Sequence, residues 1–75
     1  MSVDLVNNLL EESDISPKPN LHIVLYLVNG IREGNDIAVL REEVEVHMAH
    51  EPKIALVQSE KFIRQNADKL GIKVE

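Results

Sequence analysis

Residues 21–28 read Leu-His-Ile-Val-Leu-Tyr-Leu-Val, and this stretch decides which kind of fold the chain can adopt. Seven of the eight residues are apolar, and none carries a formal charge. The stretch is too short to span a bilayer, which needs about 20 residues, and it lacks the polar side of an amphipathic surface helix. We therefore expect it to be buried on nearly every side, within this chain or against a partner.

Two structures compete for this stretch. For a helix over about residues 21–33, Asn20 is a favourable N-cap and Gly34 a favourable terminator. For a strand, the β-branched and aromatic residues lead into an Asn-Gly pair at 29–30, which is typical of a hairpin turn. A hairpin needs an alternating second strand, and the Ile-Arg-Glu-Gly-Asn-Asp segment that follows does not supply one. The helix is the prediction, and a buried strand over residues 21–28 in an α+β fold is the alternative.

Helices are also predicted on both sides of this segment, the earlier one joined to it by the proline-containing linker of residues 13–19. Residues 3–12 form one helix, with Ser2 as N-cap. Its apolar stripe comprises Leu5, Val6, Leu9 and Leu10. Residues 37–50 form another helix, with Asp36 as N-cap. Its inner stripe comprises Ile37, Leu40, Val44 and Met48, widened by Val39 and Val46.

The last predicted helix covers residues 53–70. Pro52 suits its first turn, where the missing N–H of proline costs nothing. Gly71 is expected in the left-handed conformation that ends many helices, with Ile72 folding back over the last turn. Leu56, Ile63, Ala67 and Leu70 lie on one side of this helix, with the apolar residues Ile54, Val57 and Phe62 nearby.

The chain has 75 residues and no cysteine, so we predict a single domain over residues 1–75 with a small aliphatic core. A hydrophobic content of 44% argues against disorder. The predicted fold is all-α, a compact bundle of about four short helices around a central apolar helix. Because so small a core gives modest stability, we expect association with another protein or with a second copy as a homodimer.

The net charge of −5 is unevenly distributed. Residues 1–14 and 36–51 each carry −4, whereas residues 15–35 carry +1 and residues 52–75 carry +2. Acidic surface repels phosphates, so nucleic acid is not the expected partner. The alternative function is a nucleic-acid-associated regulator that uses the basic residues of the last helix, which are Lys53, Lys61, Arg64 and Lys69.

Two segments resemble parts of helix-turn-helix DNA-binding units. Residues 67–72 (Ala-Asp-Lys-Leu-Gly-Ile) resemble the helix and turn that precede a base-reading helix, but only three residues follow them. Residues 21–50 also contain two predicted helices around a short turn. The second of these helices carries three glutamates beside the single Arg41, and such a charge repels DNA. Neither segment supports DNA recognition.

Metal binding and catalysis find little support in the sequence. His47 and His50 lie three residues apart on a predicted helix, with Glu43 one turn earlier. No cysteine or nearby third histidine completes a four-ligand site. No nucleophile motif or glycine-rich phosphate loop is present. We therefore expect no enzyme activity, cofactor, bound metal or small-molecule substrate.

These features favour a small acidic protein-interaction or regulatory module, comparable in class to adaptors and inhibitors. Surplus apolar residues beside acids are typical of a helix-to-helix interface with a polar rim. The predicted partner-binding residues are Val39, Glu42, Glu43, Glu45, Val46 and Met48. Residues 1–12 carry acids and no basic start, so we recognise no signal peptide and expect a cytoplasmic location away from membranes.

Overall fold

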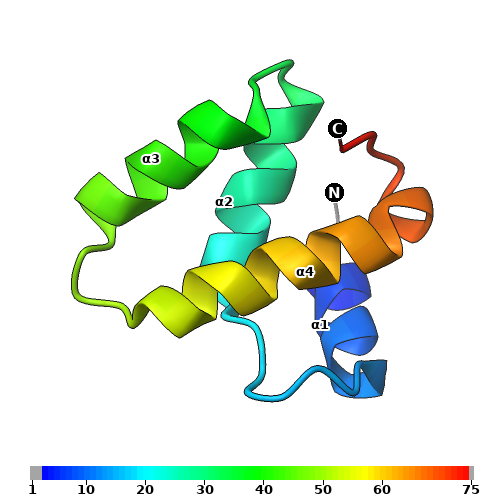
Figure 1. Cartoon of the computed structure of the whole chain (residues 1–75). Helices are drawn as coiled ribbons and strands as arrows, with labels where there is room; N and C mark the ends of the chain where they lie inside the picture. The colour runs from blue at the N-terminus through cyan, green and yellow to red at the C-terminus, as the bar shows by residue number, and fades with distance from the viewer. Residues whose placement is uncertain (1–2, 75) are drawn as a thin grey trace.

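The described part of the chain, residues 3–74, folds into four helices in this computed structural model. α1 spans Val3–Glu12, α2 Leu21–Arg32, α3 Ile37–His47 and α4 Lys53–Leu70. Figure 1 shows α2 at the centre, with α4 crossing it and α1 and α3 on its two sides. No strand occurs in residues 3–74, so the all-α prediction is confirmed and the strand alternative for residues 21–28 is wrong.

α2 is buried on most sides, as its sequence predicts, because it packs against all three other helices. Four of its apolar side chains have 0% exposure: Ile23, Val24, Leu27 and Val28. α3 crosses α2 closely at Gly30, where an added Cβ would overlap the side chain of Leu40. The absence of a side chain at Gly30 therefore allows α3 to approach the centre of the bundle.

Both ends of α2 are closed by the residues that the sequence indicates. Asn20 is the N-cap, and its Oδ1 accepts a hydrogen bond from the Ile23 N–H at 3.1 Å. At the other end the Asn35 N–H donates to the Gly30 carbonyl at 3.0 Å, and Gly34 has a φ of 97°. This is a Schellman ending, in which a left-handed glycine turns the chain toward the next helix.

α3 begins at Ile37 as predicted but ends earlier than predicted. Asp36 stands at the N-cap position, but its side chain makes no capping hydrogen bond. The helix ends at His47 rather than at residue 50, because Met48 leaves the helical conformation with φ −122° and ψ 40°. Pro52 follows shortly, and the residue before a proline avoids the helical region. The three predicted helical residues after His47 instead belong to the turn that leads to α4.

α4 contains a kink that the sequence analysis does not anticipate. Asn66 has a non-helical φ of −114° and ψ of 15°, and its Nδ2 donates to the Phe62 carbonyl at 2.9 Å. Such a side-chain bond competes with the helical backbone bonds. The helix ends as predicted, because Gly71 is left-handed with a φ of 69° and the Ile72 N–H donates to the Ala67 carbonyl at 3.0 Å. Ile72 is buried against the core.

Two buried polar side chains fasten the α1–α2 linker to α4. Gln58 Nε2 donates to the Pro17 carbonyl at 3.2 Å, and the Ser59 hydroxyl accepts from the Asn20 N–H at 3.0 Å. The Ser59 hydroxyl also donates to the Ala55 carbonyl at 2.7 Å. Because burial removes both side chains from water, these bonds offset a desolvation cost. They fix where α2 begins relative to α4.

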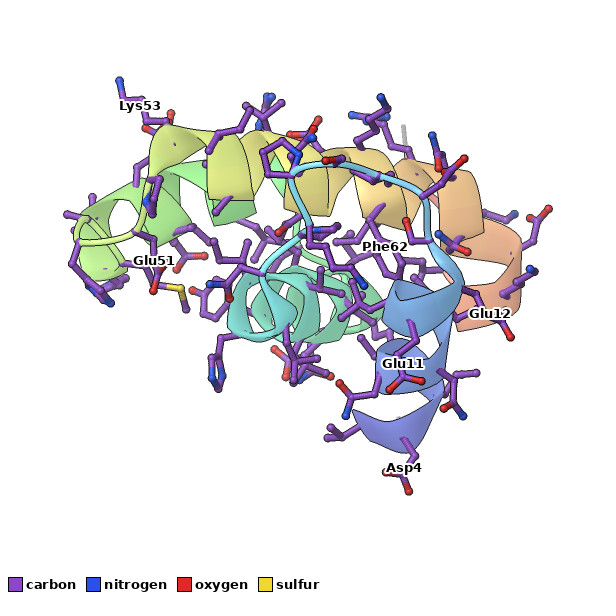
Figure 2. The ribbon with its side chains drawn as sticks, turned by 90° about the horizontal axis from the view of Figure 1, so that it is seen from below. Asp4, Glu11, Glu12, Glu51, Lys53 and Phe62 are labelled. Carbon is purple, nitrogen blue, oxygen red and sulfur yellow. The ribbon has the colours of Figure 1, made fainter. Side chains whose placement is uncertain are left out.

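The core is aliphatic apart from Phe62, the largest of the fully buried side chains. Figure 2 shows Phe62 between α4 and the other helices. Three of the four predicted stripe residues of α1 are buried, whereas Leu5 is 39% exposed. A short surface helix buries one side only, and Leu5 lies at the edge of that side. The predicted N-cap Ser2 lies outside the described residues. Among the described helices, none is long and apolar enough to cross a membrane.

Candidate functional site

The six predicted partner-binding residues do not share one surface. Three lie on the side of α3 that points away from the core, and we term them the α3 outer face: Val39, Glu42 and Val46. Val39 is 51% exposed and Val46 is 73% exposed. Their spacing of three and four residues places them along one line of the helix. The α3 outer face therefore offers two valines with a carboxylate between them.

Glu43 is turned toward α2 instead. It is half-buried and forms a hydrogen bond with the phenol of Tyr26. Desolvation raises the pKa of Tyr26, and the negative charge and hydrogen bond of Glu43 raise this pKa further. The charge of Glu33 acts in the same direction. Glu43 therefore connects α3 to α2 rather than standing on the α3 outer face.

Met48 and Glu45 line a cleft between the end of α3 and the start of α4. The cleft has a volume of about 230 Å³. Core residues from three helices form its apolar wall, namely Ile23 of α2, Val44 of α3 and Leu56 of α4. Met48 is half-buried against the same core. A partner side chain that entered the cleft would contact Met48 and Leu56, with Ile23 and Val44 lying beneath them at 0% and 3% exposure.

Three charged residues border this cleft, which are Glu45, Glu51 and Lys53. The carboxylate of Glu51 accepts a hydrogen bond from Asn20 Nδ2 at 3.2 Å and lies 3.4 Å from Nε2 of His50. These contacts hold Glu51 in place, whereas Glu45 is exposed. Figure 2 shows Lys53 pointing away from the body of the molecule. The rim therefore presents more negative than positive charge to a partner.

The basic residues of α4 fall into two groups. Three of them share the exposed side of the helix with Val57, and we term this set the α4 outer face: Lys53, Val57, Lys61 and Arg64. Val57 is 58% exposed. Lys69 instead borders a separate hollow at the end of α1, together with Glu12 and Asp14. The structure thus brings together three of the four predicted basic residues.

Arg41 of α3 adds to the positive charge beside the α4 outer face. Its Nη1 lies 3.2 Å from Oε1 of Glu60, and Nη2 of Arg64 lies 3.2 Å from Oε2 of the same carboxylate. Arg41, Lys61 and Arg64 border a shallow hollow of about 490 Å³ around Val57. Glu60 offsets part of the charge of both arginines, while Lys61 has no ion-pair partner among residues 3–74.

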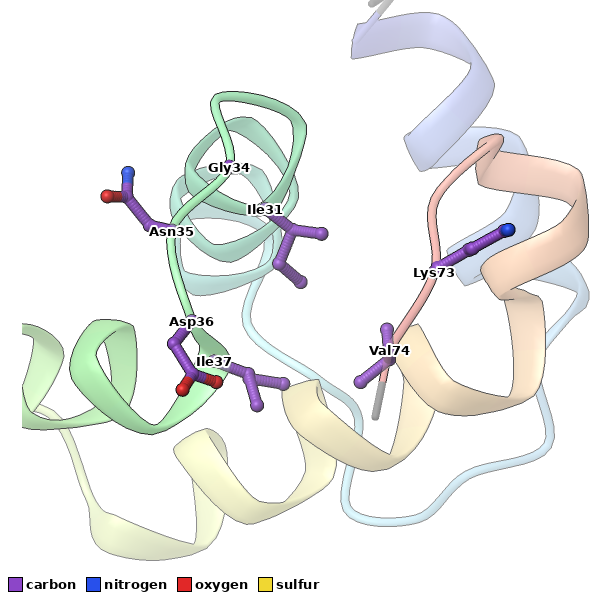
Figure 3. Close-up of a pocket in the computed structure, with 7 residues that line it drawn as sticks. All are labelled: Ile31, Gly34, Asn35, Asp36, Ile37, Lys73 and Val74. Atoms are coloured by element: carbon purple, nitrogen blue, oxygen red, sulfur yellow. The ribbon is translucent and has the colours of Figure 1, made fainter.

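A second cleft, lined by both polar and apolar residues, lies where the C-terminal tail passes the α2–α3 turn (Figure 3). It has a volume of about 390 Å³. Ile31, Ile37 and Val74 point into the space between these segments, and Asn35 and Lys73 point outward from it. Because the tail itself contributes Val74, this part of the molecule is covered from within the chain.

The considered metal ligands are not assembled into a site. Within residues 3–74, no group of three or more His, Asp or Glu side chains could hold a metal ion. His47 and His50 are exposed, and His50 lies beside Glu51. Glu43 contacts Tyr26 instead.

Several residues of these surfaces are absent from the sequence-based prediction. Val57 was assigned to the apolar residues of its helix, although its spacing from Lys53 and Lys61 places it on the basic side. A helical projection centred on Lys61 could have found it. No local signal marks Arg41, because its contact with Glu60 joins positions far apart in the chain.

Comparisons of this chain with protein-family models, with curated proteins and with solved structures found no match. Its candidate surfaces are therefore interpreted from their own chemistry.

Proposed function

We propose that this protein is a small interaction module that binds another protein through the cleft between α3 and α4 and through the neighbouring α3 outer face. The observation that carries the proposal is the cleft, whose wall consists of the core residues Ile23, Val44 and Leu56 beside a half-buried Met48. Burying one large apolar side chain contributes about 1.5–3 kcal/mol, so a partner that fills the cleft gains a specific anchor.

The charges near the cleft indicate what kind of segment fits. Glu45 is exposed at its rim, and Glu42 is exposed on the α3 outer face. Carboxylates at the edge of an apolar site favour a partner with basic residues and speed its approach. An amphipathic helix with lysine or arginine beside a leucine-sized side chain has this chemistry.

The methyl group of Met48 provides a direct test by NMR. The chain has two methionines, so methionine-methyl labelling gives a simple spectrum in which Met48→Leu assigns the signal. We expect this signal to shift when a leucine-lysine peptide patterned as an amphipathic helix is added. The same peptide with its leucines scrambled is the control and should have no effect. A Met48 signal that does not move at about 1 mM patterned peptide overturns the proposal.

A charge reversal at the rim makes the test specific. Glu45→Lys is expected to weaken binding of the leucine-lysine peptide about tenfold, because one attractive charge becomes repulsive. Glu11→Lys on α1 is the matched control, since it changes the net charge equally at an exposed site on another helix. Equal weakening by both variants would indicate general attraction to an acidic chain rather than binding at the cleft.

A second candidate function is nucleic-acid association through the α4 outer face. It is favoured by the way the fold gathers Arg41, Lys61 and Arg64 around one hollow. Phosphate binding of this kind weakens steeply as salt rises. Retention on heparin at about 50 mM salt, lost on raising the salt, is the expected result. If the protein is not retained on heparin at this salt concentration, nucleic-acid association is ruled out as a candidate function.

A further inference from the structure

We propose that the α3 outer face of one copy docks against the α4 outer face of a second copy. This inference rests on the part of the proposed function that concerns the α3 outer face, and it names a partner for that face. The two faces carry opposite charge, with Glu42 on α3 and both Lys61 and Arg64 on α4. Each face also exposes valine, at positions 39 and 46 on α3 and at position 57 on α4. The chain therefore carries both halves of a complementary contact.

The spacing of the residues on the two faces matches in one orientation. From Val46 the α3 outer face continues four residues back to Glu42 and three more to Val39. From Val57 the α4 outer face continues four residues forward to Lys61 and three more to Arg64. Steps of four and three residues follow one line of a helix. Two antiparallel helices can therefore align all three positions at once.

In this antiparallel register each pair is chemically matched. Val46 lies on Val57, which buries the exposed surface of both valines. Glu42 faces Lys61, which has no ion-pair partner among residues 3–74. Val39 lies against the aliphatic stem of Arg64, whose guanidinium keeps its contact with Glu60.

A single chain cannot make this contact with itself. Within one chain, α3 faces α4 through a different side, where Arg41 of α3 pairs with Glu60 of α4 at 3.2 Å. Val39 and Val46 remain exposed on α3 while this internal pair is formed. A second molecule is therefore needed to cover the two outer faces. If a twofold axis relates the copies, the contact forms twice and closes a dimer.

Charge exchange between two variants tests the inference. The wild-type chain should show a concentration-dependent rise in mass by light scattering, from 8.5 kDa toward twice that value, below about 1 mM. Glu42→Lys alone and Lys61→Glu alone should each weaken self-association at least about tenfold, because like charges then face each other. An equimolar mixture of the two variants should regain wild-type association, since positions 42 and 61 then carry opposite charges in both contacts between unlike copies.

Matched controls and unchanged folding complete the design. Glu11→Lys and Lys69→Glu make the same charge changes outside both outer faces and should leave self-association within about twofold of wild type. Regained association in the mixture also shows that both variants are folded. A wild-type chain that stays monomeric at about 1 mM overturns the inference, as does a mixture that fails to associate. Neither result bears on the Met48 titration, so failure here is distinguishable from failure of the proposed function.

Discussion

α2 and α3 use the same residue type for opposite purposes. Val24 and Val28 of α2 have 0% exposure, whereas Val39 and Val46 of α3 have 51% and 73%. α2 packs against three helices, so its side chains meet protein in most directions. α3 packs chiefly against α2 and leaves its other side to solvent. Within α3 the side of the helix decides, since Val44 faces α2 and is 3% exposed. A valine of α3 therefore stabilises the fold when it faces α2 and remains available for binding when it faces solvent.

An aspartate introduced into each helix should give the largest difference. Val24→Asp places a carboxylate where no water or partner can satisfy it, and we expect a loss of about 4 kcal/mol or more, enough to unfold so small a domain. Val46→Asp should leave the free energy of unfolding within about 0.5 kcal/mol of wild type, because the position is exposed. Circular dichroism with urea titration measures both. A comparable loss in Val46→Asp would show that α3 buries this side as well.

The crossing of the two helices can be tested at Gly30. Alanine there improves helix propensity but overlaps the buried Leu40, so we expect a net destabilisation of about 1–2 kcal/mol. Urea unfolding of Gly30→Ala measures the loss. The double variant Gly30→Ala with Leu40→Ala should lose less than the sum of the two single losses, because the smaller residue makes room. Additive losses would contradict a close approach at this point.

The N-caps of the two helices offer a smaller contrast. Asn20→Ala should cost about 1 kcal/mol, because the Asn20 side chain caps the Ile23 N–H and also donates to Glu51. Asp36→Ala should change the free energy of unfolding by less than about 0.5 kcal/mol, since its side chain makes no capping bond. Thermal melts of the two variants side by side decide this. Equal losses would mean that Asp36 caps α3 after all.

The smallest of the expected effects is a change in the pKa of Tyr26 of α2, whose phenol forms a hydrogen bond with Glu43 of α3. Tyr26 is the only tyrosine and the chain has no tryptophan, so phenolate absorbance reports its titration alone. Its pKa lies above the ordinary value of 10.0, and Glu43→Gln should lower this pKa by removing a negative charge. Because the folded chain holds the proton more tightly, its contribution to stability is present below pH 10.0 and is lost as the pH rises through the folded-state pKa. A Tyr26 pKa that does not change in Glu43→Gln would show that the two side chains are uncoupled.

Much of the fold could be predicted because its signals are local. Asn20, Gly34 and Gly71 close helices through conformational preferences and bonds that reach only a few residues along the chain. The predictions fail at two polar side chains, Asp36 and Asn66, whose hydrogen bonding differs from what their local sequence suggests. Asp36 is a favourable capping residue without a capping bond, and Asn66 bonds to a backbone carbonyl and kinks its helix.

The candidate surfaces could be predicted only in part for the same reason. Periodicity identified Val39 and Val46 as lying off the inner stripe, and both are exposed. Periodicity could not predict that Glu42 lies on the α3 outer face while Glu43 turns toward α2. This difference depends on the position of Tyr26, which belongs to another helix. Of the four predicted basic residues, Lys69 lies away from the α4 outer face, near the end of α1. Arg41 of α3, which was not predicted, lies beside the α4 outer face.

An all-α chain with a buried central helix is the prediction of the sequence alone, because residues 21–28 are apolar, follow a favourable N-cap and are not followed by a second strand. Which apolar residues remain outside, and which charges meet, depends instead on tertiary packing. Ile23, Val44 and Leu56 form one cleft wall although they belong to three helices. Such contacts depend on how rigid helices cross, and the crossing is set by close-packed side chains such as Leu40 over Gly30.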